Sequence, residues 1–257
     1  MTFASTFTDL VATSSAAANA AHHPPEQSER ARRQAEVVEA LRPHVPAHAL
    51  LYQSEDTTPY ECDGLTAYRQ RPLLVCLPET YAQVQAVLQA CHAIGAPVIA
   101  RGAGTGLSGG AMPHPMGVTL SLAKFNKILK VDAYSRTALV QCGVRNLAIS
   151  EAAAPYGLYY APDPSSQIAC TIGGNVAENS GGVHCLKYGL TVHNVLKVKG
   201  FSIEGEPVEF GSDALDTPGL DLLAVMIGSE GMLAVVTEVT VKLVPKPQLA
   251  RCIMASF

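Results

Sequence analysis

The feature that most constrains this chain is the glycine segment, residues 102–117, which follows a short apolar run at residues 97–100. Within it, Gly104-x-Gly106-x-x-Gly109 has the spacing of a dinucleotide-binding loop, and it follows an expected strand. A Rossmann site also needs a helix directly after the glycines, because the helix N-terminus faces the cofactor pyrophosphate. Pro113 and Pro115 stand there instead, and proline removes backbone donors and breaks a helix. The sequence therefore predicts a loop from strand to strand and argues against a Rossmann NAD site.

The density of glycine in this segment still needs a physical reason. In the run RGAGTGL (residues 101–107), backbone N–H groups can converge into a nest that binds an anion without a helix. Glycine also lets the backbone approach a phosphate closely and adopt positive φ. A flexible turn is the alternative, but a connection between two strands usually needs only a few residues. We therefore favour a phosphate-binding loop.

The pattern of apolar runs and turn residues predicts few helices and many strands. Helices are expected over residues 26–41, 80–94 and 146–154. Strands are expected over residues 73–77, 97–100, 118–122, 128–132, 137–142, 195–203, 207–210 and 232–244. Because helices and strands do not alternate regularly, we predict an α+β fold with two lobes rather than one parallel sheet.

Composition divides the chain into four parts. Residues 1–49 are expected to form a helix after a tail that is rich in Ala, Ser and Thr up to residue 24. Residues 50–71 are expected to be an irregular lead-in, and residues 72–245 the main domain, with lobes at about 72–122 and 128–245. Residues 246–257, at a Pro-Lys-Pro linker, are interpreted as the start of a further C-terminal domain that the chain does not contain.

Composition also argues against several classes of partner. The formal net charge of −4 provides no basic surface for nucleic acid. No apolar run approaches the roughly 20 residues of a membrane-spanning helix, so we expect no direct membrane insertion. The seven cysteines show no C-x-x-C pair, which is typical of free thiols in a reducing compartment. We expect a cytoplasmic protein that reaches the inner membrane only through partner subunits.

Four motifs in a fixed order carry a resemblance to a known family. They are RGAGTGLSGG (101–110), PDPSS (162–166), TIGGNVAENSGG (171–182) and IGSEG (227–231). Together they resemble the FAD-binding PCMH-type domain of the vanillyl-alcohol oxidase family, in its branch of D-2-hydroxyacid dehydrogenases. YECDG (60–64) and VHCLKYG (183–189) are similar to the flavin subunits of bacterial glycolate oxidases, and the likeness covers residues 50–257.

The resemblance implies two α+β lobes with FAD stretched between them and held non-covalently, because the histidine that links FAD in some relatives is absent from the first loop. It implies that residues 101–107 hold the pyrophosphate, that residues 163–166 and 171–179 line the flavin and its linker, and that residues 230–231 flank the adenine end. Backbone donors suit a doubly charged pyrophosphate, and apolar walls suit a flat ring. The residues implied for cofactor binding are Arg101, Gly102, Ala103, Gly104, Thr105, Gly106, Leu107, Pro162, Asp163, Pro164, Ser165, Ser166, Thr171, Gly173, Gly174, Asn175, Ala177, Asn179, Gly181, Gly182, Glu230, Gly231 and Val236.

Two positions depart from the family pattern. Ala234 stands where glycine is usual, and we expect its methyl group to crowd the cofactor. Gly200 stands where a β-forming residue is usual, and glycine within a strand costs about 0.5–1 kcal/mol. Neither change removes a binding group.

The resemblance also implies a reaction for which this chain lacks some of the groups. Oxidation of a small 2-hydroxy acid needs a base for the hydroxyl proton and a cation for the carboxylate beside the flavin. In the family these groups, with a histidine-rich metal site, come from a C-terminal catalytic domain. We therefore expect no catalytic residue and no metal ligand here, with His184 as the one alternative base and His114 and His193 as structural residues. The expected protein partners are companion flavin and iron–sulfur subunits.

Two alternatives stay open at this point. One is a free-standing FAD-binding or electron-transfer module, similar to the companion subunit of such a complex. The other is a reductase of the cell-wall UDP-sugar type, which shares the fold but takes hydride from NADPH. That enzyme needs a substrate domain of its own, for which the sequence gives no signal.

Overall fold

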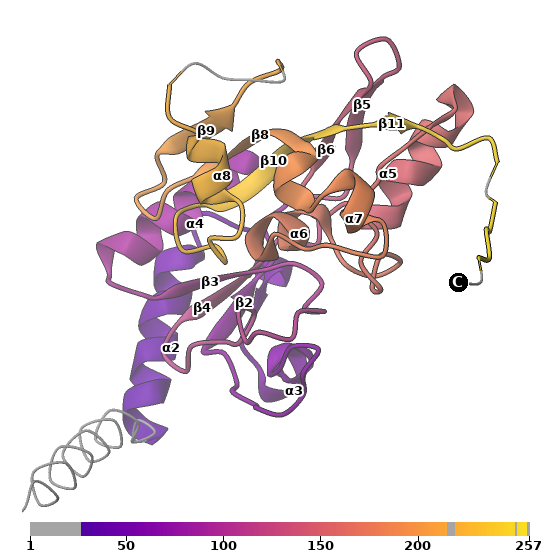
Figure 1. Cartoon of the computed structure of the whole chain (residues 1–257). Helices are drawn as coiled ribbons and strands as arrows, with labels where there is room; N and C mark the ends of the chain where they lie inside the picture. Colours follow the sequence, from indigo (N-terminus) through magenta and orange to yellow (C-terminus); the bar gives the residue numbers. More distant parts are fainter. Residues whose placement is uncertain (1–26, 215–218, 250, 256–257) are drawn as a thin grey trace, which may run out of the picture.

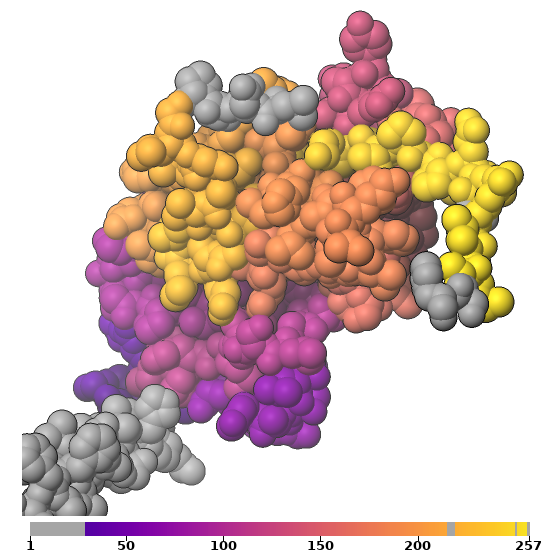
Figure 2. Space-filling model, viewed as in Figure 1, coloured from indigo at the N-terminus to yellow at the C-terminus, as the bar shows by residue number. Residues whose placement is uncertain are grey.

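The computed structural model of the chain describes residues 27–214, 219–249 and 251–255. It confirms the predicted α+β class, with two lobes that each have their own sheet and core (Figure 1). The first lobe is coloured indigo to magenta and the second mainly orange to yellow, and the space-filling view shows them packed directly against each other (Figure 2). The tail expected over residues 1–24 lies outside the described residues.

The first lobe is a four-stranded sheet with two long helices. In their order across the sheet, the strands are β1 (Leu50–Leu51), β2 (Leu74–Cys76), β4 (Val118–Ser121) and β3 (Val98–Arg101). β2, β4 and β3 run parallel, and β1 pairs antiparallel with β2. α2 (Gln27–Leu41) and α4 (Tyr81–Ala93) bury their apolar faces in the core of this lobe. α4 begins where it is predicted to begin, because Thr80 and Gln83 form a reciprocal capping box.

The second lobe is a five-stranded antiparallel sheet with short helices packed on it. Across the sheet, the strands are β5 (Ile128–Asp132), β6 (Thr137–Gln141), β10 (Val235–Lys242), β8 (Val195–Phe201) and β9 (Pro207–Gly211). Three helices share its core: α5 (Asn146–Ala153), α6 (Ile172–Glu178) and α8 (Leu222–Met226). The smaller elements are α3 (Ser54–Thr57), α7 (Cys185–Tyr188), the strand pair β7 (Leu158–Tyr159) and β11 (Val244–Pro245), and 3-10 helices at Ala47–Ala49, Thr58–Tyr60, Ala154–Tyr156 and Thr191–His193.

Four short helices, α3, α6, α7 and α8, were not predicted from the sequence. α6 contains Gly173 and Gly174, which disfavour a helix by local propensity. It forms because Thr171 caps it, its side-chain oxygen accepting a hydrogen bond from the Gly174 N–H at 3.4 Å. The predicted strand over residues 232–244 is shorter than expected and spans β10 alone, with β11 a separate strand after it.

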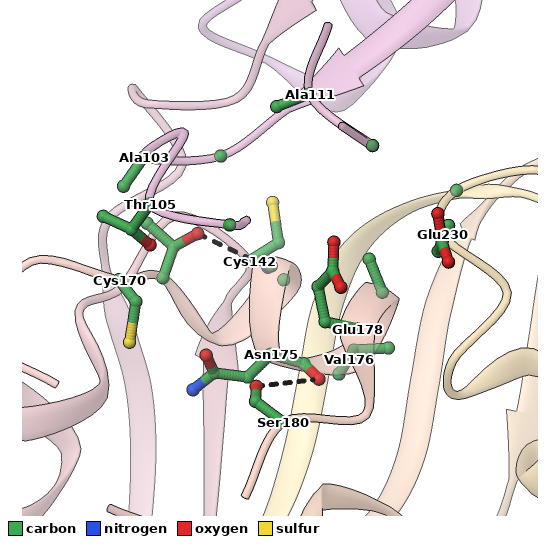
Figure 3. A pocket seen from close by; sticks show the side chains of 18 of the residues that line it. Ala103, Thr105, Ala111, Cys142, Cys170, Asn175, Val176, Glu178, Ser180 and Glu230 are labelled. Carbon is green, nitrogen blue, oxygen red and sulfur yellow. Dashed lines mark hydrogen bonds between the residues drawn. The ribbon is translucent and has the colours of Figure 1, made fainter. Parts of the chain in front are cut away.

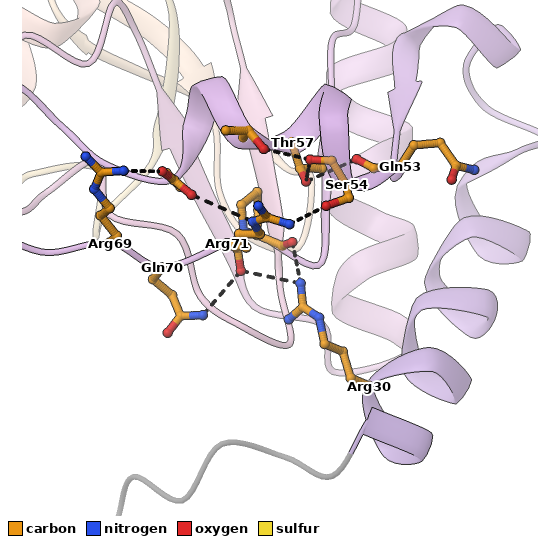
Figure 4. A network of polar contacts seen from close by, with 10 residues as sticks. Arg30, Gln53, Ser54, Thr57, Arg69, Gln70 and Arg71 are labelled. Carbon is orange, nitrogen blue, oxygen red and sulfur yellow. Dashed lines mark hydrogen bonds and ion pairs between the residues drawn. The ribbon is translucent and has the colours of Figure 1, made fainter.

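The N-terminal helix and the lead-in are built into the first lobe rather than placed outside it. Arg30 of α2 reaches the backbone beside Arg71 (Figure 4). It donates to the carbonyl of Pro72 at 2.6 Å and to that of Pro115 in the glycine segment. Gln34, one turn later, donates to the Leu73 carbonyl at 2.7 Å. Burial and the neighbouring charge of Arg71 lower the pKa of Arg30. α2 therefore holds the residues that precede β2 against the C-terminal end of the glycine segment.

The structure explains why glycine, and not a β-forming residue, stands at position 200. Gly200 lies in β8 opposite Val236, next to a register shift in the β8–β10 pairing. A Cβ atom at this position would lie 2.1 Å from the Val235 carbonyl oxygen. The close approach of the two strands requires glycine here, so the loss of β propensity is the consequence of a packing constraint.

Candidate cofactor site between the two lobes

A cavity of about 640 Å³ lies between the two lobes, in the size range of cofactor and ligand pockets (Figure 3). The first lobe contributes residues 100–107 and 110–111, and the second contributes residues 164–166, 170–171 and 173–181. The wall is closed by residues of the segment between α8 and β10, including Glu230. Three stretches that are distant in sequence, within residues 100–111, 164–181 and 226–236, thus meet at one cavity.

The glycine segment passes from β3 to β4 without a helix, as predicted. Gly104 and Gly109 adopt left-handed backbone angles, with φ of +71° and +84°. At Gly102, an added Cβ would lie 2.4 Å from the Thr171 hydroxyl oxygen, so only glycine allows the loop to approach α6 this closely. The backbone of this loop, rather than its side chains, forms the cavity wall here.

Arg101 directs its guanidinium group to the protein backbone. Its Nη1 donates to the Ala111 carbonyl at 3.1 Å, and its Nη2 donates to the Cys62 carbonyl at 2.9 Å. The side chain also lies over the Tyr60 ring, 5.6 Å from its centre. Burial lowers the pKa of Arg101, against the opposing effect of Cys62, Tyr60 and Asp63. The side chain of Arg101 therefore shapes the loop, which leaves anion binding to the backbone N–H groups that follow.

α6 places a polar group with no partner in the cavity wall. The side-chain nitrogen of Asn175, a residue only 3% exposed, has no hydrogen-bond partner within the described chain. Its polar neighbour is the Cys170 thiol, a weak acceptor, and burial raises the pKa of that thiol. A buried donor without a partner is costly, so this atom fits a ligand that brings an acceptor.

The two glycines of α6 face different surroundings. At Gly173 an added Cβ would lie 2.8 Å from the Cys142 Cβ and 3.0 Å from the Cys142 carbonyl oxygen. At Gly174 the nearest atom is the Thr171 hydroxyl oxygen at 3.4 Å, an ordinary contact, although Gly174 lines the cavity. The protein packing thus requires glycine at position 173. At position 174 it does not, because a side chain there would extend into the cavity.

Two cavity-lining carboxylates, Glu178 and Glu230, lie beside the glycine segment, and Glu230 is among the residues that the resemblance implied. An added Cβ at Gly110 would lie 3.3 Å from a Glu178 carboxylate oxygen and 3.5 Å from a Glu230 carboxylate oxygen. Ser108 donates to the other Glu178 oxygen at 2.9 Å, and Figure 3 shows the side chains of Glu178 and Glu230 near each other in the cavity wall. Glu178 lies within the expected lining stretch 171–179 but was not named as a binding residue, because α6, which carries it toward the cavity, was not predicted. Such carboxylates can accept hydrogen bonds from sugar hydroxyls.

The residues implied for cofactor binding line the cavity, except for Pro162, Asp163 and Gly182. These three lie behind the wall and hold it. The Pro162 carbonyl accepts a hydrogen bond from Asn146 at 3.1 Å, and the Asp163 carboxylate binds His184. Val176 and Glu178 also line the cavity and fall within the expected stretch 171–179 without having been named individually. The sequence did not indicate the lining residues Ala100, Gly110, Ala111, Leu122, Cys142, Cys170, Ser180 and Met226, and Ala234 was considered only as a departure. Ala234 is 5% exposed and does line the cavity.

No histidine is among the residues that line this cavity. His184, the alternative base, is not part of the wall, and His114 and His193 accept backbone N–H hydrogen bonds from Met116 and Leu190. Burial raises the pKa of the lining thiol of Cys142 to about 12, so that group is protonated and a poor nucleophile. Within the described ranges, no three His, Cys, Asp or Glu residues are grouped so that they could hold a metal ion. None of the described helices is long and apolar enough to span a bilayer.

Comparison with known sequences supports the identity of this site. The FAD binding domain family matches residues 72–211. The chain is 64% identical over 221 residues to glycolate oxidase subunit GlcD of Escherichia coli K12, covering 86% of this chain and 44% of that protein. It is 36% identical over 209 residues to D-2-hydroxyglutarate dehydrogenase of Xanthomonas citri pv. viticola, covering 81% of this chain and 44% of that protein.

Comparison with solved structures supports the fold. A structure of alkyldihydroxyacetonephosphate synthase superposes with a TM-score of 0.75 at 23% identity, covering 89% of this chain and 42% of that one. The chain therefore spans less than half the length of the proteins that it resembles. The family match, the two-lobed fold and the cavity between the lobes all indicate the same kind of domain. The chain belongs to the FAD binding domain family.

Proposed function

We propose that this chain is the FAD-binding part of a dehydrogenase that oxidises small D-2-hydroxy acids of the glycolate and D-lactate type. The observation that carries the proposal is the cavity between the lobes. Residues from all four motifs of the sequence analysis (101–110, 162–166, 171–182 and 227–231) line it. Its neighbours in sequence include a glycolate oxidase subunit and a D-2-hydroxyglutarate dehydrogenase. Bound FAD would supply the hydride acceptor.

The chain's own residues would bind and orient this cofactor without a covalent link. Backbone N–H groups of residues 102–107 would receive the pyrophosphate, and glycine at 102 and 104 permits the required close approach. Residues 164–166 and 171–179 would flank the flavin, with the Asn175 side-chain nitrogen as a donor to it. Glu230 and Gly231 would flank the adenine end.

The groups that act on the substrate would come from outside this chain. Among the cavity-lining residues, Arg101 is the one side chain with a positive charge, and its donors are directed to backbone carbonyls. The carboxylates of Glu178 and Glu230 would repel, rather than hold, the carboxylate of a 2-hydroxy acid. A base and a carboxylate-binding cation would therefore be supplied by the remainder of a longer protein.

The proposed setting is a complex of several subunits. The GlcD relatives are named as subunits of glycolate oxidases. We infer that this protein has companion flavin and iron–sulfur subunits in the cytoplasm, and that it contacts the inner membrane through those partners. Electrons that reach the flavin would leave through them.

One set of measurements tests the proposal. The purified chain should take up FAD in equimolar amount, and the longer protein that contains it should reduce an acceptor dye with glycolate or D-lactate. Failure of the chain to bind FAD would refute the cofactor assignment. FAD binding by the longer protein without dye reduction by any 2-hydroxy acid would favour a non-catalytic FAD module, and NADPH oxidation would favour the reductase alternative.

A further inference from the structure

Three residues of the lead-in, Cys62–Gly64, form hydrogen bonds with the glycine segment and with Arg101, which precedes it. We call these three residues the strap. Asp63 is 6% exposed, and both of its carboxylate oxygens accept backbone hydrogen bonds. Oδ2 accepts from the Gly109 N–H at 2.9 Å, and Oδ1 accepts from the Leu65 N–H at 3.0 Å. A buried carboxylate is tolerated only when it is hydrogen-bonded, so this pairing is part of the folded architecture.

The strap also contacts the start of the glycine segment. The Gly64 N–H donates to the Gly106 carbonyl at 2.9 Å. An added Cβ at Gly64 would lie 2.8 Å from the Thr105 carbonyl oxygen and 3.0 Å from that of Gly106. The two backbones therefore run so close together that glycine is needed in the strap as well as in the loop.

Arg101 completes the attachment. Its guanidinium group joins the Cys62 carbonyl in the strap to the Ala111 carbonyl beyond the glycines. The loop is thereby held at Gly106, at Gly109 and at Ala111. Asp63 acts electrostatically on Arg101, so the two buried charges offset each other.

We infer that Asp63 is a positioning residue that presets the glycine segment for a diphosphate ligand. This inference rests on the proposed function. A carboxylate this close to a diphosphate site cannot act as its ligand, because like charges repel. Both Asp63 oxygens are instead occupied by N–H groups, and this arrangement fixes the loop before the anion arrives. A preset loop loses less conformational entropy on binding, which strengthens affinity without a contact to the ligand.

The test compares Asp63→Asn with Glu61→Gln in the full chain. Asparagine has one carbonyl oxygen and an NH2 group, so it retains one of the two acceptor positions and presents a donor to the other N–H. Glu61 lies two residues away, but its carboxylate pairs with Arg69 at 3.0 Å and with Arg71 at 3.7 Å, both of them in the lead-in and not in the glycine segment. Glu61→Gln therefore removes a charge from the same stretch without touching the loop.

Two quantities are measured: the FAD dissociation constant, and the amide hydrogen exchange of residues 102–107 in the cofactor-free chain. Loss of one hydrogen bond to a charged group predicts that Asp63→Asn raises the dissociation constant about tenfold or more. Exchange of residues 102–107 should become faster in Asp63→Asn while exchange of the β8 and β10 amides is unchanged. Glu61→Gln should match the parent in both measurements.

An FAD dissociation constant that is unchanged in a folded Asp63→Asn protein would overturn the inference, and so would an equal loss in Glu61→Gln. If circular dichroism shows that Asp63→Asn does not fold, Gly64→Ala is used, since its methyl group would displace the loop from the same side. Unchanged FAD affinity in folded Gly64→Ala would then overturn the inference. A parent chain that binds no FAD would refute the proposed function instead, while exchange in the cofactor-free chain would still decide whether Asp63 orders the loop.

Discussion

The carboxylate of Asp163 is held at both oxygens by one residue, His184. Oδ2 lies 2.7 Å from the His184 ring Nδ1, and Oδ1 accepts the His184 backbone N–H at 3.0 Å. Gly182 packs against Asp163 as well, since a Cβ atom added to Gly182 would lie 2.1 Å from the Asp163 carbonyl oxygen. The pair therefore ties the wall segment at residues 164–166 to the one at residues 180–181.

Removing this pair should loosen the wall without removing a ligand contact. We expect His184→Ala to lower the free energy of unfolding by about 0.5–1 kcal/mol, since the His184 side chain is 56% exposed and solvent weakens the interaction. His184→Asn retains a donor that can reach Asp163 and should lose less. Urea unfolding of the cofactor-free chain measures both. An equal loss in the two variants would show that the ring itself, and not its hydrogen bond, stabilises the wall.

FAD should be released when the protein is denatured by acid or heat. The cavity-lining residues include no histidine, and the lining thiols of Cys142 and Cys170 have pKa values raised by burial, so no reactive nucleophile faces the cofactor. The measurement is flavin absorbance in the supernatant after precipitation of the protein. Flavin that remains with the precipitate would contradict non-covalent binding. Free FAD at about 100 times its dissociation constant should also stabilise the chain by about 2.7 kcal/mol.

Gly174 and Gly173 should respond oppositely to an added side chain. Gly174→Val should remain folded and lose FAD, because its Cβ would meet only the Thr171 hydroxyl at 3.4 Å while the rest of the side chain would occupy the cavity. Gly173→Ala should lower stability by about 1–3 kcal/mol, because its methyl group would overlap Cys142.

Circular dichroism with flavin quantitation separates these two effects. If folded Gly174→Val binds as much FAD as the unmodified chain, residue 174 does not contact the cofactor. A Gly173→Ala protein of parental stability would show that α6 can move away from Cys142.

The chain by itself should not oxidise glycolate or D-lactate, even when loaded with FAD and given an acceptor dye. Binding the cofactor supplies neither the proton acceptor nor the substrate-orienting cation. General acid–base catalysis alone typically contributes about 10²–10⁴-fold, and orientation adds several kcal/mol more. Steady turnover that His184→Ala abolishes would instead place a catalytic base on this chain.

Stability should fall as the pH rises from about 9 to about 12. Burial raises the pKa of the Cys76, Cys91 and Cys142 thiols to about 12, whereas an unfolded thiol titrates near 8.5. For a group whose pKa is raised by folding, the stabilisation is complete below the unfolded pKa and is lost between the two values, because the unfolded state releases its proton first.

Urea unfolding at pH 8 and pH 10.5 measures this dependence, with Cys91→Ala as the control. The variant should lose less stability than the parent between the two pH values, whatever its stability at pH 8. An identical pH dependence would show that the Cys91 thiol is not the titrating group.

Several elements followed from local sequence alone. Thr80 and Gln83 cap α4 where predicted, because a capping box needs only residues within one turn. The glycine segment lacks a helix because Pro113 and Pro115 exclude it locally. α6 was missed because its glycines disfavour a helix, and contacts with the first lobe and with Cys142 outweigh that preference.

By itself, the sequence determined the α+β class, the loop that is rich in backbone donors, and the motif order that identifies an FAD-binding domain. These depend on short-range chemistry: turn residues, caps and the spacing of glycines. Only the tertiary structure decided what Asp63, Glu178 and Asp163 do. The carboxylate of Asp63 binds the N–H of Gly109, 46 residues later. Glu178 in the second lobe accepts a hydrogen bond from Ser108 in the first lobe, 70 residues away. The Asp163 carboxylate does not line the cavity and binds His184 instead. Side-chain partners so far apart in sequence are fixed by how the two lobes pack, and no local pattern records that packing.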